Sequence, residues 1–304
     1  MIKFKIVVLG RSDADKLERC LKSLENQTYQ NYDVCIIDDA TYPKIMREQG
    51  VQPGNREDYQ TIAMKYCDRN STWILKINDE RKYGAFNHLQ AIHLLNCKDE
   101  DVIVDLDADD YLFSRHSLEI VKDYYTNSIM NGDTNVWLTF GSYVNLSTYK
   151  VTPTDSEHKQ YELYKKLYKD VVSSLRKSNN KNYIPNHNEQ NSIQTWAPGN
   201  CALRTYKYFL WKNINSKDFM LDGEFIKWGE DKIYMRAMME MAGCNYVCIP
   251  KLLYVYDDVG TKRKQIEGWY GRLGFESEDA VTAYTKKLNL KITKEWKRFP
   301  LLRR

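Results

Sequence analysis

Short apolar runs alternate with segments whose apolar positions recur at helical spacing through the first half of the chain. The apolar runs predict strands at residues 3–9, 33–37, 72–77, 101–106 and 136–144. Helices are expected after the first strand and at residues 56–68, 85–96 and 115–130. This rhythm predicts an α/β fold with a doubly wound, mostly parallel central sheet and helices on both faces.

The second half of the chain departs from this rhythm. Residues 145–195 predict an insertion, with a polar amphipathic helix followed by an Asn-rich loop. After it we expect a strand at 196–204, a helix at 230–242, strands at 245–249 and 252–257, and a helical C-terminus. Helix ends are expected at Ser12 or Asp13, at Ser114 and at Gly243.

Composition excludes several classes of protein. The 304 residues are 42% hydrophobic and carry a net charge of only +4, which argues against disorder and against nucleic acid as a partner. Seven scattered cysteines without a C-x-x-C pair predict a reducing compartment. Because neither a signal sequence nor a membrane span is seen, we expect a cytoplasmic protein. Residues 286–304, with eight Lys or Arg and one Glu, are a candidate for peripheral contact with an anionic membrane.

Carboxylates follow two of the expected strands. Asp38 and Asp39 end the second strand, and Asp105, Asp107 and Asp109 end the fourth, spaced by two residues. In open α/β sheets ligands bind outside the carboxyl ends of the strands. Clustered carboxylates there suit Mg²⁺ or Mn²⁺ together with a diphosphate, although solvated turn residues would give the same pattern.

A further acidic pair, Glu230 and Asp231, opens the helix at 230–242. A carboxylate there can serve as a general base, or it can simply favour the helix N-terminus electrostatically. Trp196 could stack on a sugar ring, or it could belong to the core. The chain has no P-loop and no G-x-G-x-x-G motif, which counts against the enzymes that use them.

Five segments in order resemble the GT-A glycosyltransferases, specifically inverting family 2. They are residues 11–41, KYGAFN at 82–87, the DXD-like DLDADDYL at 105–112, PGNCALR at 198–204 and GEDKIYMR at 229–236. The resemblance implies a catalytic domain at 1–260 and a basic helical extension at 261–304. Residues 1–110 would bind the nucleotide sugar, and 111–260 would form the acceptor half.

The resemblance also implies roles for individual residues. The donor nucleotide, with UDP as the expected nucleotide, would be bound by a group of polar and glycine residues, namely Arg11, Asp39, Arg81, Gly84, Asn87 and Asp107. Asp107 and Asp109 would hold Mn²⁺ or Mg²⁺. Asp231 would be the general base, with Trp196, Asn200 and Glu230 on the side of a glycan, lipid or protein acceptor.

One departure from the family concerns the metal site. Family members often have a His at the end of the core strands, where this chain reads LLYVYDDVGTKR. Asp257 or Asp258 is the candidate replacement, unless the metal is held by fewer protein ligands. Two other functions stay open from the residues: a sugar nucleotidyltransferase, and a carbohydrate-binding protein that has lost catalysis.

Overall fold

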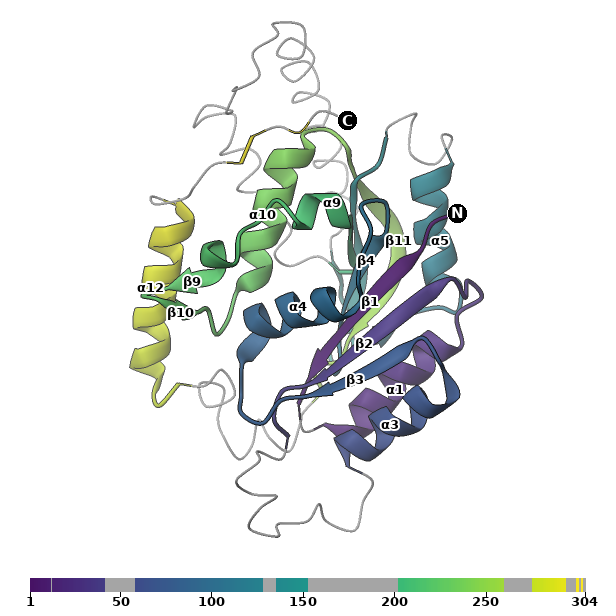
Figure 1. Cartoon of the computed structure of the whole chain (residues 1–304), viewed down its shortest axis with the longest axis horizontal. Coiled ribbons are helices and arrows are strands. Elements are labelled where there is room, and N and C mark those ends of the chain that lie inside the picture. The colour runs from purple at the N-terminus through teal and green to yellow at the C-terminus, as the bar shows by residue number, and fades with distance from the viewer. Residues whose placement is uncertain are drawn as a thin grey trace, which may run out of the picture.

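A mixed sheet with helices on both sides organises the chain, as a computed structural model shows (Figure 1). The structure describes residues 1–11, 13–41, 58–127, 135–152, 202–259, 275–293, 299–300 and 302. The strands are β1 Phe4–Gly10, β2 Tyr32–Asp38, β3 Trp73–Ile77, β4 Val102–Asp107, β5 Tyr111–Leu112, β6 Leu138–Asn145, β7 Val151–Thr152, β8 Arg204–Lys207 and β11 Tyr246–Tyr256, with a small hairpin of β9 Met220–Leu221 and β10 Glu224–Phe225. The helices are α1 Ala14–Glu25, α3 Tyr59–Arg69, α4 Tyr83–Leu94, α5 Ser117–Thr126, α9 Tyr208–Trp211, α10 Glu230–Ala242 and α12 Glu278–Thr293, with a 3₁₀ turn at Ser216–Phe219.

The strand order in the described part of the sheet is β3-β2-β1-β4-β8-β6-β11-β5, and β7 pairs with β6. The pairs β3–β2, β2–β1 and β1–β4 are parallel, and so is the pair β6–β11. β8 runs antiparallel between β4 and β6. The mostly parallel sheet is therefore confirmed. Gly10 pairs with Asp38, and Leu9 pairs with Asp107, so the carboxyl ends of β1, β2 and β4 lie at one edge.

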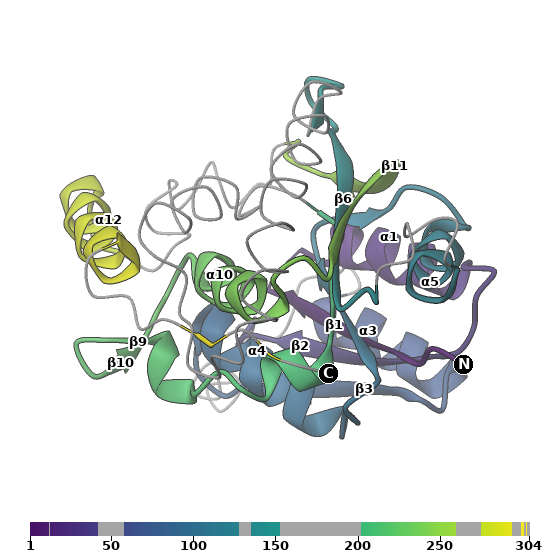
Figure 2. The same ribbon diagram turned by 90° about the horizontal axis from the view of Figure 1, so that it is seen from above.

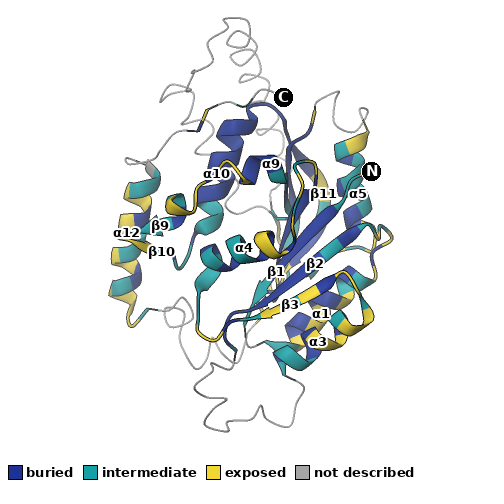
Figure 3. Cartoon of the chain, viewed as in Figure 1, coloured by how far each residue is buried: buried dark blue, intermediate teal, exposed yellow. Residues whose placement is uncertain are grey.

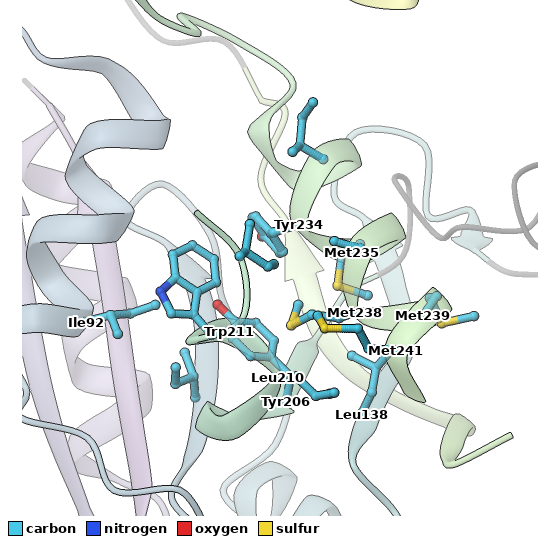
Figure 4. Close-up of a cluster of buried hydrophobic side chains, with 14 of the residues drawn as sticks. Ile92, Leu138, Tyr206, Leu210, Trp211, Tyr234, Met235, Met238, Met239 and Met241 are labelled. Carbon is cyan, nitrogen blue, oxygen red and sulfur yellow. The ribbon is translucent and has the colours of Figure 1, made fainter. Parts of the chain in front are cut away.

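Two hydrophobic cores lie on opposite faces of this sheet. One contains residues of α1, α3 and α5, and the other contains residues of α4, α9 and α10. Because side chains alternate along a strand, Ile6 and Val8 of β1 enter the first core while Val7 enters the second. Figures 2 and 3 show the helices on both sides and the buried strands between them. Figure 4 shows the Met-rich side of α10 packed toward Tyr206 and Leu138.

Several expected boundaries need correction. The strands expected at 245–249 and 252–257 are one strand, β11, with register shifts between Cys248 and Tyr254. Pro250 lies there and has no N–H to donate to a neighbouring strand. Ser114 is not the cap of α5, because that helix starts at Ser117 after His116. The described strand near 196–204 is β8, which begins only at Arg204.

The C-terminal residues pack against the rest of the chain more closely than a solvated tail would. Leu288 and Phe299 belong to the core that α10 helps to form. The backbone N–H of Phe299 donates to Glu240 at 3.0 Å, and that of Leu302 donates to the Met241 carbonyl at 2.9 Å. Most of the expected insertion at 145–195 lies outside the described residues. No helix in the described ranges is long and apolar enough to cross a bilayer.

Candidate active site

The end of β2 brings two carboxylates to the sheet edge, and each has protein partners. Asp38 is fully buried and accepts hydrogen bonds from the backbone of Thr41 and from the side chain of Gln60. Asp39 accepts from the backbone N–H groups of Lys82 and Tyr83, at 2.7 and 3.1 Å. Asp39 therefore sits at the N-terminus of α4, where a negative charge is favoured.

The other expected donor-binding residues surround Asp39. Arg81 Nε lies 3.9 Å from an Asp39 oxygen, and Arg11 donates to the Ala40 carbonyl at 3.3 Å. Asn78 donates to both Asp39 and Asn87, at 3.2 and 2.7 Å. The structure thus brings Arg11, Asp39, Arg81 and Asn87 together, linked by Asn78. Asn78 was not among the residues expected in the site, although it directly follows β3 at the same edge of the sheet.

Gly84, expected to bind the donor nucleotide, lies against Glu230. A Cβ atom on Gly84 would stand 1.9 Å from Glu230 Oε1 and 2.5 Å from its Cδ. The glycine therefore leaves the space that the Glu230 carboxylate fills beside the first turn of α4. Burial raises the pKa of Glu230 to about 7, and the neighbouring Asp231 adds to the shift. Near neutral pH this carboxyl group can both take up and release a proton.

Asp107, the last residue of β4, is exposed at the sheet edge, and Asp109 follows in the turn. Desolvation by the protein atoms around the Asp107 carboxyl group raises its pKa to about 6; Arg204 opposes this shift, whereas Asp109 and Asp231 increase it. This mutual repulsion among carboxylates is the property that a bound cation would relieve.

Asp105 does not join the exposed carboxylates but anchors a buried network beneath them. It accepts hydrogen bonds from Tyr206 and Tyr234, at 3.0 and 2.7 Å, and lies 2.9 Å from His88 Nε2. Burial opposes the charge on Asp105, but His88 and Arg204 outweigh it and lower its pKa. His88 stacks on Trp211, which lies near Tyr206 and Tyr234 in the cluster of Figure 4.

Arg204 connects the two acidic groups. It starts β8 opposite Asp105, so the antiparallel register brings its guanidinium to the edge where β4 ends. Its Nη1 donates to Asp231 at 3.1 Å, and its Nε lies 4.0 Å from Asp105. Burial works against its positive charge, but the surrounding acidic groups outweigh it and raise its pKa. In the sequence Arg204 is only the last residue of the PGNCALR segment at 198–204, and its ionic partners could not be read because they are distant along the chain.

The candidate third metal ligands are engaged in other contacts. Asp257 is buried and pairs with Lys16 at 3.2 Å and with Arg19, while Asp258 accepts from Ser147 at 2.9 Å. Both candidates therefore already have protein partners, and Asp257 is paired with two cations. No three His, Cys, Asp or Glu side chains within the described residues converge on a metal position.

The remaining residues still fit a divalent metal. Asp107 and Asp109 can supply two carboxylate oxygens, as hard cations prefer. Mg²⁺ commonly binds one or two carboxylates and completes its shell with substrate phosphates and water. Trp196 and Asn200, expected on the acceptor side, lie outside the described residues.

No family model matches the chain, and no curated protein matches its sequence. Among solved structures, a 1–349 fragment of S. aureus TarS in complex with UDP-GlcNAc matches 96% of this chain and 73% of its own, with a TM-score of 0.54 and 14% identity. S. aureus TarS itself matches 96% of this chain with a TM-score of 0.53 and 13% identity. The chain shares the GT-A fold with these structures.

These matches differ in how much of the other protein they cover. The chain spans 60% of the first TarS fragment and 44% of TarS itself. A mannosyltransferase, PcManGT from Pyrobaculum calidifontis in complex with GDP-Man and Mn²⁺, matches 89% of this chain and 59% of its own at 12% identity, with a TM-score of 0.49.

Proposed function

We propose that the chain is a glycosyltransferase that moves a sugar from a nucleoside-diphosphate sugar to an acceptor hydroxyl with inversion. One observation carries the proposal: the strand-end carboxylates of β4 face the two carboxylates that open α10, with Arg204 between them. A donor held at the sheet edge would then lie next to a candidate base. The GT-A fold supports this arrangement, and the UDP-GlcNAc bound by the TarS fragment supports a UDP-sugar as the first donor to test.

On the donor side, Arg11, Asp39, Arg81 and Asn87 would bind the nucleotide. Asp107 and Asp109 would hold Mn²⁺ or Mg²⁺. That metal, when bound, would act as a Lewis acid that stabilises the charge of the leaving diphosphate.

On the acceptor side, Asp231 would take the proton of the attacking hydroxyl. One carboxylate oxygen of Asp231 accepts a hydrogen bond from Arg204 at 3.1 Å. The other oxygen of Asp231 accepts from the backbone N–H of Lys232 at 2.9 Å. A carboxylate offers about four lone-pair sites, so Asp231 can still accept from a hydroxyl. Glu230 lies beside it, against α4.

The test is a panel of nucleotide sugars incubated with Mn²⁺, with Mg²⁺ or with chelator. We expect metal-dependent release of one nucleotide, lost in Asp109→Ala. Asp231→Asn should lower turnover by at least about 100-fold while donor affinity stays unchanged. Asp99→Asn is a matched control, because Asp99 pairs with Lys212 at 2.6 Å near the amino end of β4, away from this edge. Full transfer by Asp231→Asn would refute the base assignment.

Two outcomes would replace the proposal altogether. Release of pyrophosphate from a nucleoside triphosphate and a sugar phosphate would identify a nucleotidyltransferase. Binding of nucleotide sugars without turnover on a wide acceptor panel would identify a binding protein.

A further inference from the structure

The turn that precedes Glu230 and Asp231 is held by the C-terminal helix. The hydroxyl of Tyr284 in α12 accepts a hydrogen bond from the Lys227 backbone N–H at 2.9 Å. Lys227 lies in the turn of residues 227–229, directly before α10. One side-chain oxygen of α12 therefore holds a peptide group of this turn.

Leu288, one helical turn after Tyr284, holds the last residue of the same turn. Gly229 adopts φ +82°, a left-handed conformation that favours glycine, and it is the N-cap of α10. A Cβ on Gly229 would stand 2.9 Å from Leu288 Cδ2, and Leu288 is almost fully buried. The backbone direction with which α10 starts is thus set by packing against α12.

Further contacts join the turn to α4 and join α12 to α10. Lys227 Nζ lies 5.3 Å from the ring centre of Tyr83, the first residue of α4. The Tyr284 ring packs against Phe275 at 4.9 Å, and Arg236 of α10 donates to the Ile292 carbonyl of α12. The carboxylate of Glu230 is close enough to Tyr284 to contribute to the raised pKa of its hydroxyl.

We propose that Tyr284 and Leu288 are positioning residues for the two carboxylates that open α10. The inference rests on the proposed function. Glu230 must reach the space left by Gly84, and Asp231 must reach Arg204, from adjacent positions on one helix turn. A shift of about 1 Å in such groups can cost about 100-fold in rate, so the anchoring of residues 227–229 by α12 affects the reaction although α12 itself touches no reacting atom.

The test compares Tyr284→Phe with Lys287→Met in the full chain. The first variant keeps the aromatic ring and removes the oxygen that binds the turn. The second removes an exposed ion pair to Asp222, 2.7 Å long, from the same helix. Amide hydrogen exchange is measured over residues 226–232, together with kcat/KM for the acceptor, donor KM and the melting temperature.

We expect Tyr284→Phe to exchange about tenfold faster at the turn and to lose about tenfold in kcat/KM for the acceptor, with donor KM unchanged and Lys287→Met like the wild type. A purely structural role would lower the melting temperature without this split between acceptor and donor. Unchanged exchange, or faster exchange with unchanged transfer, overturns the proposal. If the wild type transfers no sugar from any donor, the proposed function fails and the positioning role fails with it, even where exchange shows that α12 holds the turn.

Discussion

Replacing Gly84 with alanine tests the contact that joins the two halves of the site. The new Cβ would lie 1.9 Å from Glu230 Oε1, whereas ordinary contact begins at 3.4 Å, so the carboxylate has to move by the difference, about 1.5 Å. The atom that moves is the end of a flexible side chain, which keeps the cost in stability small. Alanine is also favoured over glycine within a helix by up to about 1 kcal/mol. We therefore expect an unchanged or slightly higher melting temperature.

The expected effect is on activity. A displacement above 1 Å predicts a loss of about 100-fold in kcat/KM for the acceptor, with donor affinity retained. The measurement is a double-mutant cycle with Glu230→Ala, in which transfer rates and donor binding by calorimetry are compared for all four proteins. In the Glu230→Ala background, Gly84→Ala should have no further effect, because nothing remains for the Cβ to displace.

Two results would refute this reasoning. Full activity of Gly84→Ala would show that the position of the Glu230 carboxylate does not matter for transfer. Weaker donor binding in both backgrounds would show that Gly84 contacts the donor, as the family resemblance implied.

Three further predictions concern the charges of the site. Arg204→Met should lower the free energy of unfolding by about 3 kcal/mol in urea titrations, since it leaves buried carboxylates without their cation, and Arg204→Lys should lose less. Glu230 and Asp107 have pKa values of about 7 and 6 in the folded protein, above their ordinary values, so the metal-free folded state binds more protons. Its melting temperature should therefore rise from pH 8 to pH 6, and Glu230→Gln should flatten this rise; a fall over that range contradicts the shifts. Asp257→Asn should lower stability by leaving Lys16 buried without its carboxylate, yet should not change Mn²⁺ affinity measured with UDP present; a large loss of metal affinity would restore Asp257 as a ligand.

Deleting residues 286–304 would be a poor test of the peripheral membrane contact that the basic C-terminus suggests. Deleting residues 286–304 would remove Leu288 and Phe299 from the core, so loss of liposome binding by that variant would be confounded by unfolding. Replacing only exposed lysines, such as Lys287, separates charge from packing.

The sequence determined the features that depend on local pattern. Period-two and 3.6-residue repeats follow from backbone geometry, so the main strands and the exact bounds of α10 were readable from apolar spacing. Because parallel strands end at one edge, the grouping of Asp39 with Asp107 also followed from the pattern. The GT-A fold was readable from five weak motifs in order.

Only the tertiary structure decided which partners each carboxylate has. Asp105, Asp107 and Asp109 look equivalent in sequence, yet the first accepts hydrogen bonds from two tyrosines and lies against His88 beneath the edge. Asp257 is paired with Lys16, 241 residues away. The pairing of Gly84 with Glu230 and the anchoring of the turn before α10 by α12 are likewise contacts between distant segments. Charge, burial and hydrogen bonding of such groups depend on which segments meet in space, and local patterns carry no information about that.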